Sequence, residues 1–296
     1  MEKGNLYIML AAVLYSAQPI LVKLAYGEVP GFLMFSLRFF GMLFIFLPLA
    51  FHFKRQVWSE IRQWKKFVFP ALFVLGAVCF FTVGIYYTRN ATLTALLIKT
   101  NSVFIPLMTA ALFVEERRVL FSKRFLAGVA LAGVGVLGVI TGGGPLSITF
   151  SIGVVLVLVS QFSWSLYSVS IKRLIRRKNR LVVLCFIFPL AFLFSVPFAA
   201  YDIAVNALSI NPLFLPIPIA SGIIVGAANL FQFKAIESKG LIVTNAFSLT
   251  TPLMTGLMGF AVFGEMLSLT QLAFAAILIS GAYFIIKCKC DIRAID

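Results

Sequence analysis

The chain contains ten apolar segments of roughly twenty residues each, and their length constrains its fold more than any single motif. A bilayer core about 30 Å thick is crossed by about 20 helical residues, so each segment is long enough to span a membrane. Charged residues make up 12% of the chain, whereas a soluble globule uses about 25% to cover its surface. The approximate bounds of the segments are 5–26, 31–53, 67–87, 91–114, 125–141, 151–171, 181–201, 213–236, 241–264 and 268–287.

The segments are predicted to be helices. Strands of a membrane barrel alternate apolar and polar residues over roughly ten positions, but a run such as 154–159 is apolar throughout. The predicted fold class is therefore an all-α membrane protein with ten transmembrane helices.

The basic residues predict which segment ends share one side of the membrane. The net charge is +15, and most of the 25 Lys and Arg lie after the second, fourth and sixth segments or near the two ends of the chain. Because basic loops stay on the cytoplasmic side, both termini are expected to be cytoplasmic. Contact with anionic lipid in the bilayer accounts for this charge, so no nucleic-acid partner is expected.

The two halves of the sequence repeat each other. Pro-Leu-Met-Thr occurs at 106–109 and 252–255, and Tyr15-Ser16 has its counterpart 149 residues later at Trp164-Ser165. These offsets pair the first five segments with the last five. Because five is odd, paired helices cross the membrane in opposite directions, and such inverted repeats are typical of alternating-access transporters. The predicted domains are a first five-helix repeat at 1–141, a second at 151–287 and a short cytoplasmic tail at 288–296.

An alternative for the first segment is a cleaved signal peptide. Glu2 and Lys3 precede an apolar stretch, and Ser16-Ala17-Gln18 resembles a cleavage site. Cleavage would leave the second repeat without a counterpart for its first helix, so we interpret the segment as a transmembrane helix. We interpret the repeated Pro-Leu-Met-Thr as a marker of position and not as a site.

Several motifs follow one another in a recognisable order. They are an aromatic-Ser pair in the first helix of each half, Arg38-Phe39 after Pro30, Thr100-Asn101-Ser102, Thr250-Thr251-Pro252, and residues 263–269 leading through Gly281. In these features the chain resembles the drug/metabolite transporter superfamily, in particular its EamA-type branch, over essentially its whole length. The resemblance implies a transporter of small organic solutes or metabolites, often an exporter, in an inner membrane. It also implies a central cavity, lined mainly by helices 1, 3, 4, 6, 8 and 9, and no cofactor.

Two basic residues are candidates for contacting an anionic group of a substrate. An ionisable side chain at a helix centre costs about 2.5–3.5 kcal/mol on insertion scales, so it needs a partner or a use. Lys99, followed by Asn101, is the first candidate, and a lysine that extends to the interface or pairs with a carbonyl is the alternative. Arg38 is the second. The family has a similar arginine widely, so the resemblance favours a structural role for Arg38 in anchoring helix ends.

Aromatic and amide side chains complete the predicted substrate site. Gln161, Trp164 and Tyr167 are spaced by three and share a helix face. An aromatic wall with a few amides suits an amphipathic metabolite, for example an amino acid-like or nucleotide-like one. The alternatives are interfacial anchoring for the aromatics and helix–helix hydrogen bonds for the amides. The other candidate residues are Tyr15, Gln18, Asn229, Gln232 and Asn245.

Acidic residues are missing from the middle of every segment. A proton relay at the midplane is therefore not visible, which favours facilitated transport or exchange. Glu265 lies just before Ser268 and Gln271, which match a capping box for the tenth helix, so a structural role is expected for it, with proton carriage the alternative.

The sequence also bears on enzymatic function and on partner chains. No metal spacing and no set of acid, base and nucleophile is present, so the protein is not expected to be an enzyme. A non-transporting membrane sensor or assembly subunit is the alternative function. Gly222 and Gly226 are typical of close helix packing, within one chain or in a homodimer.

Overall fold

The computed structural model describes residues 3–112, 122–141, 152–175, 179–206, 210–248, 250–266 and 268–293, and every regular element within these ranges is a helix. Over the same residues, six helices are long and apolar enough to cross a membrane. They are α1 (Lys3–Leu24), α2 (Gly31–His52), α4 (Val68–Thr88), α8 (Ile152–Ile175), α9 (Arg180–Asn206) and α10 (Pro216–Ser248).

Other helices fill the rest of the bundle. The longer of them are α6 (Asn101–Leu112), α7 (Lys123–Thr141), α11 (Thr251–Phe263) and α12 (Leu269–Arg293). The short ones are α3 (Lys54–Ile61), η1 (Trp64–Phe67), α5 (Ala91–Leu97), η2 (Ile98–Thr100) and η5 (Pro212–Phe214). The predicted tail at 288–296 continues α12 as far as Arg293.

The fourth helix predicted in each half is interrupted. In the first half, the 3-10 turn η2 separates α5 from α6, so the expected helix 91–114 is not one element. In the second half, the expected gap between 236 and 241 is helical, because α10 continues to Ser248, and α11 begins afresh at Thr251. Pro252 lies in the first turn of α11, where its missing amide hydrogen costs nothing. The prediction of a single helix over 241–264 is therefore wrong.

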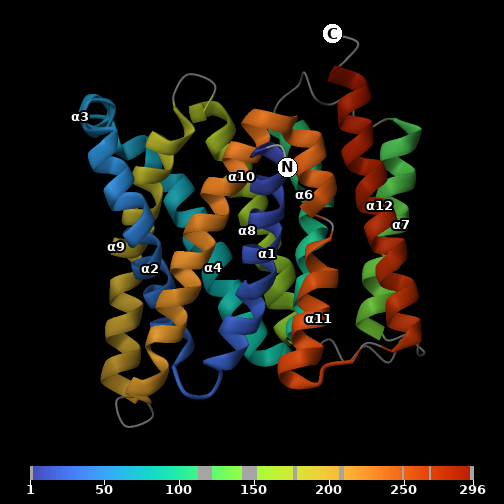
Figure 1. Ribbon diagram of the computed structural model, residues 1–296, viewed down its shortest axis with the longest axis horizontal. Helices are drawn as coiled ribbons and strands as arrows, with labels where there is room; N and C mark the ends of the chain where they lie inside the picture. Colours follow the sequence, from blue (N-terminus) through green and yellow to red (C-terminus); the bar gives the residue numbers. More distant parts are fainter. Residues whose placement is uncertain are drawn as a thin grey trace.

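Helix contacts follow a pattern that is unchanged when the two halves are exchanged. α1 packs along α10, and correspondingly α4 packs along α8. α6 contacts α8, and α11 contacts α1. The pairs α2 with α9 and α7 with α12 each join a helix to its own counterpart, and Figure 1 shows them at opposite sides of the bundle. Figure 1 also shows α10 bending over at the top of the molecule before the chain descends through α11.

Glycines bring α2 and α10 into backbone contact. A Cβ added at Gly41 would lie 2.1 Å from the carbonyl oxygen of Ile219, and one added at Gly222 would lie 2.0 Å from the carbonyl oxygen of Arg38. Gly226 also faces α2. The predicted close packing is thus confirmed, and it is packing within the chain, so these two glycines are not the basis of a homodimer face.

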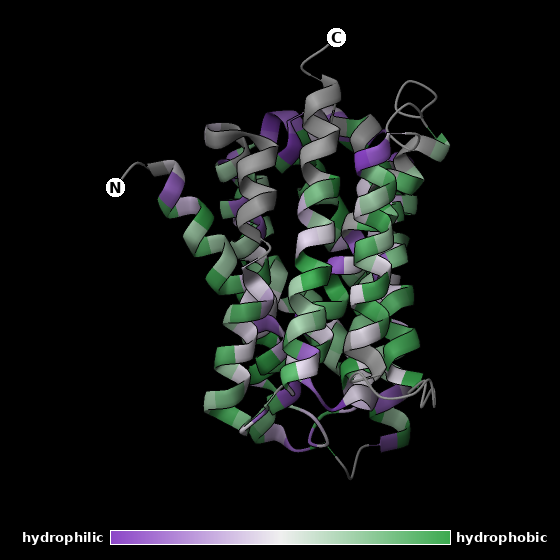
Figure 2. Ribbon diagram, turned by 90° about the vertical axis from the view of Figure 1, so that its right-hand side faces the viewer, coloured by the Kyte–Doolittle hydropathy of each residue, from purple (hydrophilic) through white to green (hydrophobic). Residues whose placement is uncertain are grey.

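The outer surface of the bundle is apolar. Figure 2 shows hydrophobic residues along the helices and hydrophilic ones gathered toward the ends. Large apolar side chains such as Phe44, Leu193 and Leu257 are exposed, as expected for a surface that faces lipid. α1 begins and α12 ends at the upper end of Figure 1, where α3 also lies. The structure is that of a multi-pass membrane protein.

Candidate functional site

A cavity of about 160 Å³ lies inside the bundle, between the two halves. The first half lines it with α1, α2, α4, α5, η2 and α6, and the second half with α8, α9, α10 and α11. Among the described residues in this lining, two are basic and none is acidic. The polar and aromatic members are Tyr15, Gln18, Arg38, Phe81, Lys99, Asn101, Ser160, Gln161, Trp164, Phe188, Asn229, Gln232, Thr251 and Thr255.

Lys99 reaches the cavity from the interrupted helix of the first half. It lies in η2, and only 7% of its surface is exposed. Lys99 and Asn101 are two residues apart and would point to different sides of a regular helix, yet both line the cavity across the interruption. The neighbouring Thr100 is buried, and its hydroxyl donates to the carbonyl of Leu97 at 2.8 Å. The break in the helix therefore places a positive charge beside the cavity.

Arg38 is completely buried inside α2 and also lines the cavity. Its Nη1 donates to the hydroxyl of Thr82 at 2.7 Å, and that hydroxyl donates in turn to the carbonyl of Val78. The guanidinium carbon lies 5.3 Å from the centre of the Phe81 ring. Among the described residues, no group hydrogen-bonds to its Nε or Nη2. Arg38 is thus part of the cavity wall and does not anchor a helix end.

Of the eleven residues predicted for the substrate site, nine line this one cavity. Tyr167 does not: it is buried behind Trp164, with 5.1 Å between the ring centres. The side chain of Asn245 lies outside those that the structure describes. Tyr15 donates to the amide oxygen of Gln232 at 2.8 Å, so these two candidates join α1 to α10 across the halves. Whether the nine residues bind a substrate stays a prediction.

Sequence patterns did not single out Ser160, Thr251 or Thr255 as site residues. Thr255 belongs to the second Pro-Leu-Met-Thr, and its hydroxyl donates to the carbonyl of Ser16 at 3.0 Å. The repeat marks position, as expected, but its second copy also contributes to the cavity wall. A Ser or Thr residue carries little sequence signal, because its hydroxyl can hydrogen-bond to a backbone carbonyl of its own helix and need not face a site.

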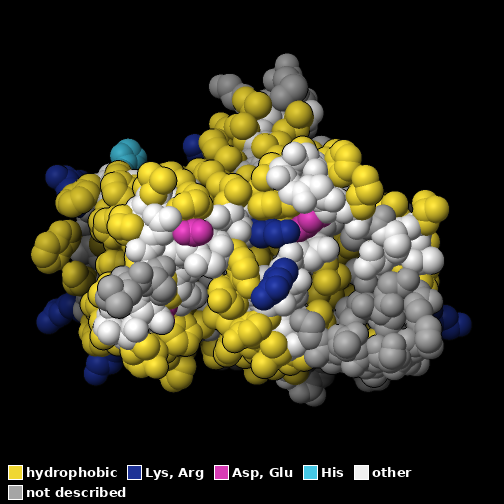
Figure 3. Space-filling view, turned by 90° about the horizontal axis from the view of Figure 1, so that it is seen from below, with side chains coloured by type: hydrophobic (Ala, Val, Ile, Leu, Met, Phe, Trp, Pro, Cys, Tyr) yellow, Lys and Arg dark blue, Asp and Glu magenta, His cyan; other side chains and the backbone are white. Residues whose placement is uncertain are grey.

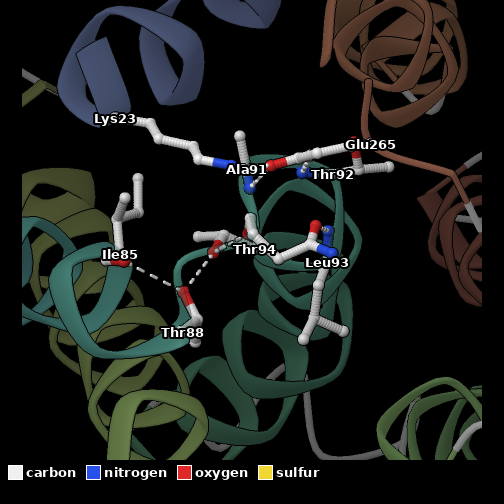
Figure 4. Close-up of polar contacts among 9 residues, drawn as sticks. Lys23, Ile85, Thr88, Ala91, Thr92, Leu93, Thr94 and Glu265 are labelled. Carbon is white, nitrogen blue, oxygen red and sulfur yellow. Dashed lines mark hydrogen bonds and ion pairs between the residues drawn. The ribbon is translucent and has the colours of Figure 1, made fainter. Parts of the chain in front are cut away.

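A polar cluster joins the ends of α1, α5 and α11 (Figure 4). We name it the clasp: Lys23 at the end of α1, Glu265 after α11, and Ala91 and Thr92 at the start of α5. Lys23 Nζ lies 2.5 Å from Glu265 Oε1, and the amide of Ala91 donates to the same oxygen at 2.9 Å. The amide and hydroxyl of Thr92 donate to Oε2 at 3.0 and 2.7 Å. The clasp therefore ties the second half to two helices of the first.

Local geometry positions the clasp residues. Gly264 adopts a left-handed φ of 66° at the end of α11, which turns the chain so that Glu265 meets α5. Asn90 caps α5 by accepting from the amide of Leu93 at 2.8 Å. Lys23 extends to the end of its helix as an interfacial lysine would, but there it meets a carboxylate. Figure 3 shows this end of the molecule as mostly hydrophobic, with few charged side chains.

Glu265 lies in the link between α11 and α12, outside the membrane-spanning helices. Burial raises the pKa of its carboxyl, but hydrogen bonds from Lys23, Ala91 and Thr92 outweigh burial, so the pKa is lower than its ordinary value. The carboxylate is therefore held ionised. The predicted capping box is confirmed, since the Ser268 and Gln271 side chains each accept from the other residue's amide at 3.1 Å.

Comparison with known proteins identifies the family. A model described as the EamA-like transporter family matches residues 2–141 and, a second time, residues 151–287. The chain belongs to this family. Two matches in succession show the two-repeat architecture of EamA-like transporters, whose members are transporters and not enzymes. The EamA resemblance predicted from the sequence is confirmed.

Similarity to individual proteins adds little beyond the fold. No curated protein matches the chain. One solved crystal structure, whose description names no activity, is 20% identical and aligns over 95% of each chain with a TM-score of 0.63. At that identity the likeness shows a shared fold alone, and it carries no information on the solute.

Proposed function

We propose that this EamA-like protein moves a small organic metabolite across the inner membrane by alternating access, as an exporter or exchanger. The observation that carries the proposal is the cavity itself, which takes its lining from both repeats and holds polar and basic groups in an otherwise apolar bundle. A cavity between two related halves can face either side of the membrane as the halves change their relative positions.

The interrupted helices support this proposal. Transporters built from inverted repeats commonly form their binding sites where a helix is broken near the middle of the membrane. Here η2 interrupts one half and the start of α11 interrupts the other, and Lys99 and Thr251 line the cavity at these points. The proposed topology is ten crossings in two inverted repeats, with both termini cytoplasmic.

The clasp defines the state of the molecule in this proposal. Gln18 lines the cavity and Lys23 follows it about one and a half turns later on α1, so the clasp lies just below the cavity. With both termini cytoplasmic, this lower end faces away from the cytoplasm, and the clasp closes that side.

Transport is tested with the purified protein in sealed vesicles. Metabolite profiles of cells with and without the protein first nominate solutes, and each is then measured for saturable flux and counterflow. We expect flux in proportion to protein and acceleration by unlabelled solute on the far side. A pore would show neither saturation nor counterflow, and a sensor or assembly subunit would show no flux for any nominated solute; either result would overturn the proposal.

A further inference from the structure

We infer that Arg38 is the anchor for a carboxylate or phosphate group of the transported solute, so that the solute is an organic anion. This inference rests on the proposed function and names the class of substrate for the same cavity. It is carried by the hydrogen bonding of the guanidinium and by the charges in the cavity wall.

The guanidinium has one edge in use and one edge without a partner. Nη1 is engaged by Thr82, whereas the buried Nε and Nη2 have no hydrogen-bond partner among the described residues. Nε–H and one Nη2–H point the same way and form a fork that matches the two oxygens of a carboxylate or phosphate. Buried charged donors without partners are costly, and a bound anion would satisfy both at once.

No acidic side chain among the described residues of the cavity wall performs this task. The lining contains no Asp or Glu among these residues, and Glu265 is paired with Lys23 in the clasp. Phe81 lies against the guanidinium, and Thr82 fixes one of its nitrogens, so the free edge is held in place. In our inference, an anion in the cavity, which Arg38 lines, meets this preorganised group.

The rest of the cavity wall indicates what else the solute carries. Lys99 adds a second positive charge on the side of the first repeat. The second repeat offers the amides Gln161, Asn229 and Gln232 and the indole of Trp164. A solute fits this division if it places an anionic group at Arg38 and the rest of it is uncharged and either flat or able to hydrogen-bond to amides. A solute with only positive charge does not fit.

Binding is tested with small molecules that share a phenyl ring and carry a negative, neutral or positive group. The protein has three tryptophans, so Trp58→Phe and Trp64→Phe leave Trp164 as the reporter in the cavity. Its fluorescence is measured in the full-length protein in nanodiscs against phenylacetate, phenyl phosphate, neutral phenylacetamide and cationic phenethylamine. We expect saturable change with phenylacetate or phenyl phosphate, and binding of the amide and the amine at least tenfold weaker. The stronger of the two anions identifies carboxylate or phosphate as the preferred group.

Variants separate Arg38 from general charge. Arg38→Gln should lose the preference for the anion over the amide. Arg38→Lys keeps the charge but lacks the fork, and should weaken anion binding about tenfold while it keeps the preference. Lys234→Gln removes an exposed cation outside the cavity lining and should change neither. If Arg38→Gln does not fold, as judged by its apparent melting temperature, Arg38→Lys still decides.

Three results would overturn the inference: no saturable response to either anion, an anion preference that survives in Arg38→Gln, or anion binding that Arg38→Lys does not weaken. Its failure differs from failure of the proposed function. Saturable counterflow of an uncharged solute would contradict the inference about Arg38 but support transport. Arg38-dependent anion binding without any flux would contradict transport but support an anion site at Arg38.

Discussion

At the scale of single residues, the ionised Glu265 is expected to stabilise the protein in a pH-dependent way. Its pKa is below the ordinary value of 4.5, so the folded state prefers the carboxylate. The stabilisation is complete above the unfolded value and is lost as the pH falls through the lower, folded value. Glu265→Gln should lower the apparent melting temperature at pH 7 by at least about 2 °C. It should also flatten the loss of stability that the unchanged protein shows as the pH drops below about 4.5.

Melting temperatures measured between pH 3 and 8 in detergent check this expectation. Glu60→Gln, on α3 at the other end of the bundle, is the matched control and should keep the wild-type profile. Parallel profiles for Glu265→Gln and the unchanged protein would show that the clasp does not depend on the charge of this carboxylate.

Individual residues also show where sequence reasoning succeeds and where it stops. Lys99 and Arg38 could be predicted because a charge inside a membrane segment needs a reason, whatever the tertiary structure. Trp164 and Tyr167 could be placed on one helix face by their spacing, but only the structure shows that Trp164 faces the cavity and Tyr167 lies behind it. Periodicity gives a shared face and does not give the neighbour that covers part of it.

At the scale of elements, the crossing of α2 and α10 is expected to depend on glycine. Gly41→Ala would put a methyl group 2.1 Å from a backbone oxygen of α10, which neither helix can relieve by rotating a side chain. Overpacking of this kind costs about 1–3 kcal/mol. Because Arg38 lies one turn before Gly41 on the same helix, the change should also disturb the cavity wall.

The control is Gly133→Ala on α7, where an added Cβ meets nothing within 4 Å. Alanine is about 1 kcal/mol better than glycine inside a helix, so this variant should be neutral or slightly stabilised. Apparent melting temperatures of both variants in the same detergent give the comparison. Equal effects at the two positions would mean that the α2–α10 contact is loose enough to absorb a methyl group.

The helix ends were harder to predict than the helices. Apolar length predicted the six helices that are long enough to cross a membrane, and the capping box at Ser268 and Gln271 could be predicted because its chemistry is local. The stretch after Ala235 was predicted to be a gap because it is polar, yet α10 continues through it to Ser248. For the helix breaks at η2 and before α11, the only indications in the sequence were Thr, Asn and Pro residues.

At the scale of the whole molecule, the repeat could be predicted because an offset near half the chain length pairs every segment, and the exchangeable contacts of α1 with α10 and α4 with α8 agree with it. The clasp could not be predicted from the sequence. Lys23 and Glu265 are 242 residues apart, and neither local sequence indicates that the other residue is its partner. Long-range polar contacts of this kind depend on how the halves dock, which the sequence pattern does not describe.

The clasp is expected to hold the cavity closed toward the lower end. Combining Lys23→Met with Glu265→Gln removes the ion pair between the halves, so the lower side should open more often. Val78→Cys, in a background with the four native cysteines replaced by alanine, reports access to the cavity. A membrane-impermeant maleimide added from the non-cytoplasmic side should label it several-fold faster in the clasp variant.

Two further cysteines are the controls. Arg89→Cys, exposed at the lower end, should label equally in both backgrounds, and Glu60→Cys should label only after the membrane is permeabilised. Unchanged labelling of Val78→Cys would show that other contacts between the halves, and not this ion pair, keep the lower side shut.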